Sequence, residues 1–239
     1  MKLAEFLKSP KVDLAAVFLL MALGVFLLLR VWLQDHPQHN PWVPLDLRDP
    51  PGWTTRQKLA DLRVNSDACR TILERSGIGF VSYEPVGEGA CRRDDRLSLT
   101  RAPLSPSLPQ TSCAVAAGFA MWFAQSVEPA ARKILGSGIA RIEHLGSYNC
   151  RRINSGKSGS WSEHATGNAI DITGFTLEDG RRISVLKDWQ SGDEKGLFLR
   201  AVRDGACGVF GTVLSPDYNV AHADHFHLDQ QKRTWGVCR

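Results

Sequence analysis

The sequence lacks several patterns that would assign it to a familiar functional class. No block of Lys and Arg stands out among its 239 residues and the formal net charge is only +4, so a nucleic acid is not an expected partner. It has no GxSxG motif and no serine placed beside a base, which argues against a serine hydrolase. No internal repeat is visible either. With an otherwise ordinary composition, the length predicts one domain with an appendage.

What the sequence does contain is a long apolar run near its N-terminus. Leu14 to Leu29 reads LAAVFLLMALGVFLLL, and residues 31–33 extend the run beyond Arg30. About 20 such residues span the hydrocarbon core of a bilayer, and an arginine near the far end can extend its side chain to the interface. We therefore predict a single-pass anchor in the inner (cytoplasmic) membrane through residues 14–33.

The flanks of this run predict its orientation and its retention. Three lysines precede it, so the positive-inside rule places the short N-terminus in the cytoplasm: Lys2, Lys8 and Lys11. The run is long for a signal peptide, and no small residues follow it at a cleavage site, which favours an uncleaved anchor over a signal sequence. Residues 1–33 then form the cytoplasmic N-terminus and the anchor, and the rest of the chain lies in the periplasm.

The cysteines lack the C-x-x-C spacing of structural zinc sites and of thioredoxin-like motifs. Their number is even and all of them follow the apolar run, which fits an oxidising compartment outside the cytoplasm. We expect up to three disulfides whose connectivity the sequence leaves open, formed by Cys69, Cys91, Cys113, Cys150, Cys207 and Cys238.

Residues 34–53 are rich in proline and polar residues and sustain neither helical nor strand periodicity. We predict an extended linker that lifts the following domain off the membrane. His36 and His39 lie in this segment, and we interpret them as solvated side chains rather than as metal ligands.

Residues 54–239 are predicted to form one α+β domain with a mostly antiparallel sheet and flanking helices. Helical patterns cover residues 55–62, 66–75, 112–127, 129–135 and 195–203, with Met121 and Trp122 as core residues. Strands are predicted at 81–83, 97–100, 139–142, 169–175, 183–185 and 225–230. A turn at 178–180 makes the strands around it a hairpin.

The stretch SEHATGNAID places a histidine, His164, seven residues before Asp171. On one helix these two residues would be about two turns apart, too far to bind one ion. Gly167 and the β-branched residues around Asp171 favour a loop that leads into a strand. A turn at Gly167 would bring His164 back to Asp171, and that geometry suits a metal ion.

Near the C-terminus, AHADHFHLD carries His222, Asp224, His225, His227 and Asp229. From 225 to 230 polar and apolar residues alternate, which predicts a half-buried strand with its histidines on the open face. Side chains two apart on one face are separated by about 7 Å, so one histidine can bind a metal ion while its neighbour faces the substrate.

His164, Asp171 and one histidine of the cluster could converge on one ion. Two imidazoles and one carboxylate with an open fourth position are typical of a hydrolytic zinc site, so we expect Zn as the cofactor. The alternative is that these are ordinary polar residues on the surface of a sheet, which is the better interpretation for any one of them alone.

Together these segments resemble a known family. SxHxxGxAxD at 162–171, followed by HxxHxH at 222–227, is similar to the zinc DD-peptidase and Hedgehog fold, which includes the penicillin-insensitive murein endopeptidases. The sequence resembles the bacterial extensin-like C-terminal family more closely from about Leu59 onward, through GSYNCR (146–151), HATGNAIDITGF (164–175), DGAC (204–207), VLSPDYN (213–219) and HADHFHLD (222–229).

The resemblance implies roles for individual residues. The implied zinc ligands are His164, Asp171 and His227, with His225 beside the bound water. The base is left open among Asp224, His225 and His222, and Arg151 is implied to hold the substrate carbonyl, with Arg152 as the rival. Ser162 and Asp229 are expected to orient the ligands.

With these residues, the resemblance implies a metallopeptidase that hydrolyses stem or cross-bridge peptides of peptidoglycan, as an endopeptidase or a carboxypeptidase. One alternative is a zinc-containing binding module without activity, since the Hedgehog relatives keep the metal in a signalling protein. The other is a structural protein of the cell envelope, in which the disulfides and the anchor matter more than the site.

Overall fold

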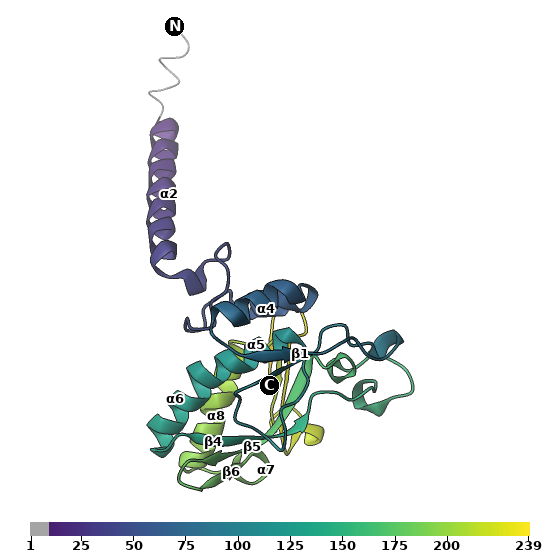
Figure 1. Cartoon of the computed structure of the whole chain (residues 1–239). Coiled ribbons are helices and arrows are strands. Elements are labelled where there is room, and N and C mark those ends of the chain that lie inside the picture. Colours follow the sequence, from purple (N-terminus) through teal and green to yellow (C-terminus); the bar gives the residue numbers. More distant parts are fainter. Residues whose placement is uncertain (1–9) are drawn as a thin grey trace.

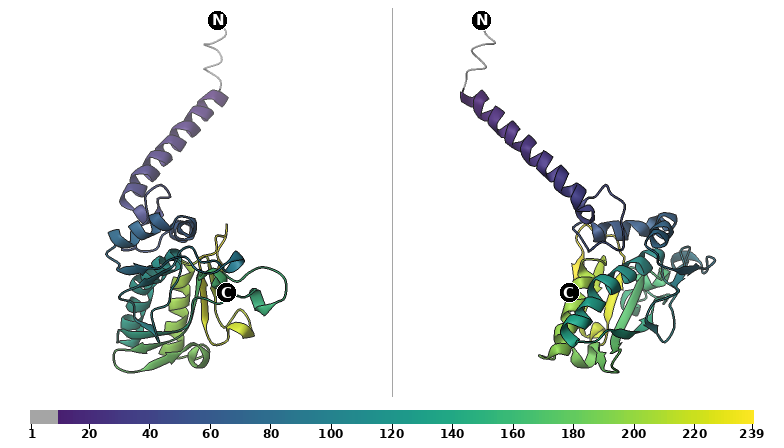
Figure 2. Two further views of the ribbon diagram at one scale, coloured as in Figure 1. Left: turned by 45° about the vertical axis from the view of Figure 1, so that its right-hand side comes forward. Right: turned by 60° about the vertical axis from the view of Figure 1, so that its left-hand side comes forward.

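The computed structural model of the chain describes residues 10–239 (Figure 1). An N-terminal helix stands away from an α+β domain in all three views of Figures 1 and 2. The predicted α+β fold class is confirmed, with a main sheet of mostly antiparallel strands, a second sheet of two strands, and helices packed beside them. Lys2 and Lys8, which enter the predicted orientation of the anchor, lie outside the described residues.

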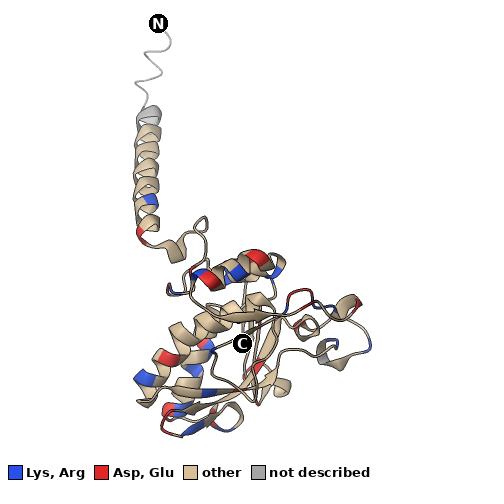
Figure 3. Ribbon diagram, viewed as in Figure 1, with Lys and Arg blue, Asp and Glu red and all other residues tan. Residues whose placement is uncertain are grey.

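Helix α2 (Pro10–Asp35) contains the apolar run. Between Leu14 and Asp35 only Arg30 and Asp35 are charged (Figure 3), and the large apolar side chains of this stretch are exposed along most of its length. It is the one helix of the described residues that is long and apolar enough to cross a membrane. By length and composition it could be a membrane span or a signal sequence.

Residues 34–53 differ from the extended linker that their composition predicts, and the first two of them complete α2. Pro37–His39 form a 3₁₀ turn (η1), and Leu45 and Leu47 are buried in the hydrophobic core of the domain. Proline content did not reveal these contacts, because two leucines separated by one residue are enough to hold a segment on a core. The second half of the segment is therefore part of the domain's packing.

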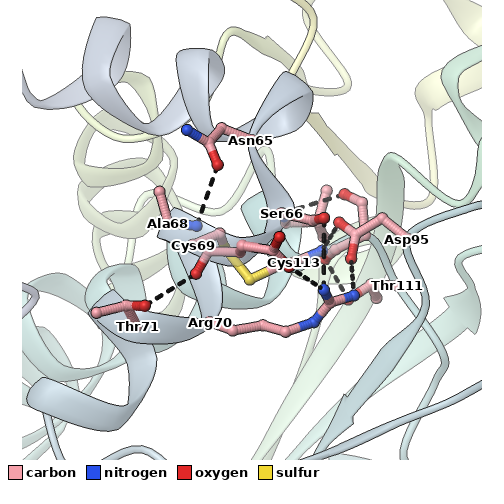
Figure 4. Close-up of a disulfide and its surroundings, with 12 residues drawn as sticks. Asn65, Ser66, Ala68, Cys69, Arg70, Thr71, Asp95, Thr111 and Cys113 are labelled. Carbon is pink, nitrogen blue, oxygen red and sulfur yellow. Dashed lines mark hydrogen bonds and ion pairs between the residues drawn. A yellow bond between two sulfur atoms is a disulfide. The ribbon is translucent and has the colours of Figure 1, made fainter.

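The first helices of the domain lie where the sequence predicts them: α3 (Thr55–Asp61), the 3₁₀ turn η2 (Leu62–Val64) and α4 (Ser66–Arg75). Asn65 caps α4, since its Oδ1 accepts a hydrogen bond of 3.1 Å from the N–H of Ala68 (Figure 4). A two-stranded antiparallel sheet of β1 (Phe80–Ser82) and β2 (Leu97–Leu99) follows, with the 3₁₀ turn η3 (Gly89–Cys91) between its strands.

A single helical rod runs from Cys113 to Leu135, where the sequence predicts two helices. It consists of α5 (Cys113–Trp122), the π-helical turn η4 (Phe123–Val127), α6 (Glu128–Ala130) and a second π-helical turn, η5 (Ala131–Leu135). Pro129 therefore lies inside the rod and does not open a new helix. The wider π-helical turns on both sides shift the hydrogen-bond register, which accommodates a residue without an N–H.

The main sheet has seven strands in the order β3-β4-β5-β8-β7-β9, and β6 pairs with β5. The outer pairs β3–β4 and β7–β9 are parallel and the inner pairs are antiparallel. The strands are β3 (Leu104–Ser105), β4 (Ile139–Gly146), β5 (Ala169–Leu177), β6 (Arg182–Ser184), β7 (Thr212–Leu214), β8 (Phe226–Asp229) and β9 (Val237–Cys238). β5 is central, because its first half pairs with β8 and its second half with β6.

The helical rod and α8 (Glu194–Cys207) pack on one face of this sheet. Trp122 is fully buried there, and its Nε1–H donates a hydrogen bond of 2.8 Å to the carbonyl oxygen of Val202 in α8. Its ring meets Phe175 of β5 edge to face at 6.3 Å. Both Met121 and Trp122 are core residues, as predicted.

All six cysteines are paired, as expected for an oxidising compartment. One bond joins α4 to the start of α5 (Figure 4), another joins η3 to the loop after β4, and the third joins α8 to β9. The pairs are Cys69–Cys113, Cys91–Cys150 and Cys207–Cys238.

Candidate metal centre

The register between β5 and β8 places two of the predicted ligands side by side. Asp171 of β5 is directly opposite His227 of β8, and their neighbours Ile170 and Ile172 point into the core. Directly opposed residues in an antiparallel pair are close enough for their side chains to touch. His227 Nδ1 is 3.0 Å from Asp171 Oδ1.

The third predicted ligand reaches them from the turn before β5. His164 lies in the 3₁₀ turn η7 (Glu163–Thr166), which ends at Gly167 in the left-handed region with φ of 70°. This conformation is easy only for glycine, and it returns the chain into β5. His164 Nε2 is then 3.2 Å from Asp171 Oδ1 and 3.1 Å from His227 Nδ1. The turn that the sequence predicts at Gly167 is confirmed.

The remaining nitrogen of each imidazole is held by an acceptor. His164 Nδ1–H donates to the carbonyl oxygen of Ser147 at 2.9 Å, and His227 Nε2–H donates to Asp229 Oδ2 at 3.0 Å. In neutral imidazoles these bonds leave His164 Nε2 and His227 Nδ1 without hydrogens. Metal-binding histidines in proteins are oriented by hydrogen bonds of this kind.

Three acceptor atoms therefore point into one small space. The ligand atoms of His164, Asp171 and His227 all lie within 4.8 Å of one another, and the three residues are buried or half-buried. Lone pairs brought together in a buried place repel one another unless a cation lies between them. The group could hold a metal ion.

The pKa values of Asp171 and His227 also indicate that this group favours a positive charge. Burial raises the pKa of Asp171, but hydrogen bonds from His164 and His227 outweigh burial and hold that pKa far below its usual range. Burial lowers the pKa of His227, but hydrogen bonds to Asp171 and Asp229 outweigh it and raise the pKa to about 9. Without a metal ion, His227 is therefore protonated at pH 7. That proton supplies the positive charge that a bound metal ion would supply.

His225 lies beside this group and is oriented by its neighbour. Its Nδ1–H donates to Asp224 Oδ1 at 2.8 Å, while its Nε2 lies 3.7 Å from Asp171 Oδ1. The second nitrogen of His225 therefore faces the metal group. Asp224, by contrast, is exposed, and one of its oxygens is already engaged by His225.

His222 completes the cluster from the 3₁₀ turn η8 (Val220–His222). Its ring centre lies 5.1 Å from that of His225 and 6.0 Å from that of His227, and its Nδ1–H donates to Asn219 Oδ1 at 2.8 Å. Burial, together with the positive charges of neighbours that include His225 and Arg151, lowers the pKa of His222 to about 4. His222 is therefore neutral at pH 7.

The two candidate arginines have different surroundings. The charge of Arg151 contributes to the low pKa of His222, so Arg151 is near enough to that histidine for its charge to act on it. Arg152 lies over the ring of Trp161 at 4.4 Å and donates a hydrogen bond to the carbonyl oxygen of Gly159. Next to them, the 3₁₀ turn η6 (Ile153–Ser155) forms part of the same loop.

Ser162 caps the η7 turn. Among the contacts of the described residues, its side chain bonds to the backbone of His164 and does not contact Asp171 or His227. Its Oγ accepts a hydrogen bond of 3.3 Å from the N–H of His164. Asp229 contacts the group directly through His227, and it also accepts a hydrogen bond of 2.8 Å from the N–H of Gln231 at the end of β8.

Sequence reasoning did not single out the residues that support the His164 turn. The carbonyl oxygen of Gly167 accepts hydrogen bonds from the N–H of Ser112 (2.8 Å) and the hydroxyl of Ser147 (3.1 Å). The Ser112 hydroxyl donates to Asn168 Oδ1 at 2.8 Å, so the turn is tied to the first residue before α5. The position of Asn168 after a turn glycine was a signal for such a bond, but its partner is distant in sequence.

Asn219 was missed as well, although a local signal was present. It precedes η8 by one residue and accepts a hydrogen bond of 3.0 Å from the N–H of Ala221, the usual position of a capping asparagine. The same oxygen orients His222.

The fold and the site define the class of this protein: an α+β domain, disulfide-linked, with a His/Asp/His group that could hold a metal ion. The family is shown by the sequence itself, which matches the family "Extensin-like protein C-terminus" over residues 67–239. The chain belongs to this family. Neither the comparison with curated proteins nor the comparison with solved structures found a match.

Proposed function

We propose that this protein is a membrane-anchored zinc metallopeptidase that hydrolyses peptide bonds of peptidoglycan in the periplasm. The observation that carries the proposal is the convergence of His164, Asp171 and His227, with the free nitrogen of His225 facing the same group. A metal group with a proton-accepting histidine on its open side has the components of a hydrolytic centre. The resemblance of both motifs to zinc DD-peptidases supports the choice of substrate.

The spacing of the three ligand atoms supports zinc. Tetrahedral zinc with bonds of about 2.0 Å separates neighbouring ligand atoms by about 3.3 Å. The separations in the group are 3.0, 3.1 and 3.2 Å. Two imidazole nitrogens and one carboxylate are also a donor set that suits zinc. Bound there, zinc would polarise the attacking water and the scissile carbonyl group.

The residues of the chain provide the proton transfers. His225 Nε2 accepts a proton from the water while its Nδ1–H stays bonded to Asp224. The water oxygen bonds to the carbonyl carbon, the C–N bond breaks, and His225 returns the proton to the leaving amine. The contacts favour His225 as the base over Asp224, whose carboxylate orients the imidazole.

Arg151 and His222 line the open side of the group in this proposal. The guanidinium of Arg151 stabilises the negative charge that develops on the carbonyl oxygen. His222 is neutral at pH 7 and bonded to Asn219 through Nδ1, so its Nε2 is available to accept a hydrogen bond from a backbone N–H of the peptide substrate.

The test is digestion of purified peptidoglycan by the full chain in detergent, with the soluble products analysed by mass spectrometry. We expect products that vanish with a chelator and return with added zinc, and their masses identify the bond that is cut. A folded, zinc-loaded protein that releases no products would contradict the proposal and favour a zinc-containing binding protein of the envelope. A chain that binds no metal would leave only a structural role.

Variants separate metal binding from catalysis. His227→Ala should lose both zinc and activity, whereas His225→Ala should keep zinc, measured by elemental analysis, and lose about 10²–10⁴-fold in kcat. Arg151→Ala should lower kcat/KM by about 10²–10³-fold. Arg152→Ala is the matched control, because its side chain lies on Trp161, and it should change kcat/KM far less.

A further inference from the structure

The end of α2 is joined to the domain by a cluster of aromatic rings. Trp32 stacks on His36 (4.3 Å between ring centres), on His39 (5.2 Å) and on Trp53 (5.4 Å). Trp53 also lies 4.4 Å from His39, whose Nδ1 accepts a hydrogen bond of 3.1 Å from the N–H of Trp53. We call Trp32, His36, His39 and Trp53 the exit cluster.

When α2 spans a bilayer, the exit cluster lies at the depth of the membrane surface. With a rise of 1.5 Å per residue, a hydrocarbon core of about 30 Å corresponds to about 20 residues of helix. The apolar stretch of 22 residues begins at Leu14. About 20 residues counted from there end at Leu33. Trp32 is therefore at the boundary between acyl chains and headgroups, and Trp53, stacked on it, is at the same depth although it belongs to the domain's side of the chain.

A third tryptophan, Trp42, is held close to the same boundary. The amide of Asn40 donates to the carbonyl oxygen of Leu33 at 3.5 Å, and Asn40 Oδ1 accepts a hydrogen bond of 3.0 Å from the N–H of Trp42. The ammonium group of Lys58 fixes this loop to α3 by donating to the carbonyl oxygens of Asn40 (2.6 Å) and Val43 (2.7 Å). Trp42 is thus attached to the last turns of α2 and to the domain at once.

Both tryptophans are open to the surroundings rather than buried in protein. The exposed fraction is 82% for Trp42 and 74% for Trp53. Both indoles are connected to the end of a helix that could cross a membrane, Trp53 through Trp32 and Trp42 through Asn40. Indole is the side chain that prefers the membrane–water interface, because its ring is apolar and its N–H is a hydrogen-bond donor.

We propose that Trp42 and Trp53, with Trp32, dock the domain on the headgroup layer of the bilayer that α2 crosses. Their partner is a phospholipid surface, since all three tryptophans lie on or are tied to the end of the apolar stretch. The domain then sits on the membrane in one orientation instead of moving at the end of a flexible linker. This inference requires α2 to span the membrane, and it is independent of the proposed peptidase activity.

The test is fluorescence quenching of the full chain in phosphatidylcholine nanodiscs, with and without lipids brominated near the headgroup end of the acyl chains. The chain has seven tryptophans, so each contribution is obtained by subtracting the emission of a single Trp→Phe variant from that of wild type. Phenylalanine keeps an aromatic ring in the exit cluster, and circular dichroism verifies the fold of each variant. Trp42→Ser and Trp53→Ser are a second pair of variants for the same subtraction.

We expect Trp32→Phe, Trp42→Phe and Trp53→Phe each to remove emission that bromolipids quench. Trp161→Phe is the control, because it lies on the loop after β4, whose η6 turn lies away from α2 in Figure 1, and it should remove emission that bromolipids leave unchanged. If Trp32 is quenched while Trp42 and Trp53 are not, α2 is inserted and the docking proposal is wrong. If none of the three is quenched, α2 does not span the bilayer, and the proposal fails with it.

Discussion

At the scale of single residues, the carboxylate of Asp229 fixes the orientation of one candidate ligand. It binds Nε2–H of His227, and so determines that Nδ1 faces Asp171 and His164. Its strand neighbour Leu228 points the opposite way into the core, which leaves Asp229 little freedom to move. The chemistry of the group therefore depends on a residue that does not belong to it.

Replacing Asp229 by Asn should weaken metal binding without removing a ligand. The neutral amide is a weaker acceptor than the carboxylate, and changes at such outer partners lower metal affinity by about 10–100-fold. Competition with a zinc-binding dye measures the affinity. Asp224→Asn is the matched control, because Asp224 contacts His225 instead, and its metal affinity should stay within about threefold of wild type. Equal affinities for wild type and Asp229→Asn would contradict this role.

At the scale of elements, the η7 turn is the part of the site that depends most on one backbone conformation. Gly167 has φ of +70°, and a Cβ there would meet Arg93 Nε and Nη2 at 3.0 Å. Arg93 itself is held over the ring of Tyr148 at 4.7 Å and by a hydrogen bond to the carbonyl oxygen of Gln110. Both the strain and the contact would displace His164.

Gly167→Ala should lower stability and metal affinity together. The left-handed conformation costs a residue with a Cβ about 1–2 kcal/mol, to which the displacement of Arg93 adds. Gly136→Ala is the control, since Gly136 ends the helical rod with the same φ of +70° and has nothing within 4 Å of the added Cβ. Thermal unfolding and zinc titration check both variants. The control should lose stability alone, and an unchanged zinc affinity for Gly167→Ala would contradict the role of the turn.

Many of the helices, strands and turns could be predicted from the sequence, because the signals for them are local. The alternation at 225–230, the cap before α4 and the glycine turn before β5 each depend on a few adjacent residues, and each element exists. Strands β3, β7 and β9 were not predicted, because they have only two or three residues, too few to establish a periodicity. Pro129 misled the prediction because the π-helical turns around it leave no local signal.

The site could be predicted only in part, for the same physical reason. His164 and Asp171 lie on either side of one turn, so their meeting follows from the sequence around Gly167. The pairing of Asp171 with His227 depends on the register between strands that are far apart in the chain. The carbonyl oxygen of Ser147 belongs to the backbone, so no residue type announces its bond to His164.

At the scale of the whole molecule, two of the three disulfides restrain different parts of the structure. Cys91–Cys150 joins the η3 turn to the residue before Arg151, and therefore restrains the loop that borders the histidine cluster. Cys207–Cys238 joins the end of α8 to β9 at the edge of the sheet. The first of these two bonds restrains the loop beside the site, and the second restrains the edge of the sheet.

Removing either bond by a double Cys→Ser substitution should cost similar stability. Closing loops of 59 and 31 residues removes about 4 kcal/mol of unfolded-chain entropy in both cases. Only the loss of Cys91–Cys150 should also lower kcat/KM on a peptidoglycan peptide, since only that bond restrains Arg151. Unfolding in denaturant and steady-state kinetics measure the two effects. An equal loss of kcat/KM in both variants would show that the bonds act through global stability alone.

The position of β8 in the sheet determines when the complete set of candidate metal ligands can form. β8 lies between β5 and β7 but follows both of them in the chain, and it brings His227 with it. With the proposed topology, His164 and Asp171 can meet while the rest of the chain is still being exported, but two ligands hold a metal ion weakly. We expect the ion to be acquired after export is nearly finished, from the metal pool of the compartment in which the protein works and not from that of the compartment in which it is made.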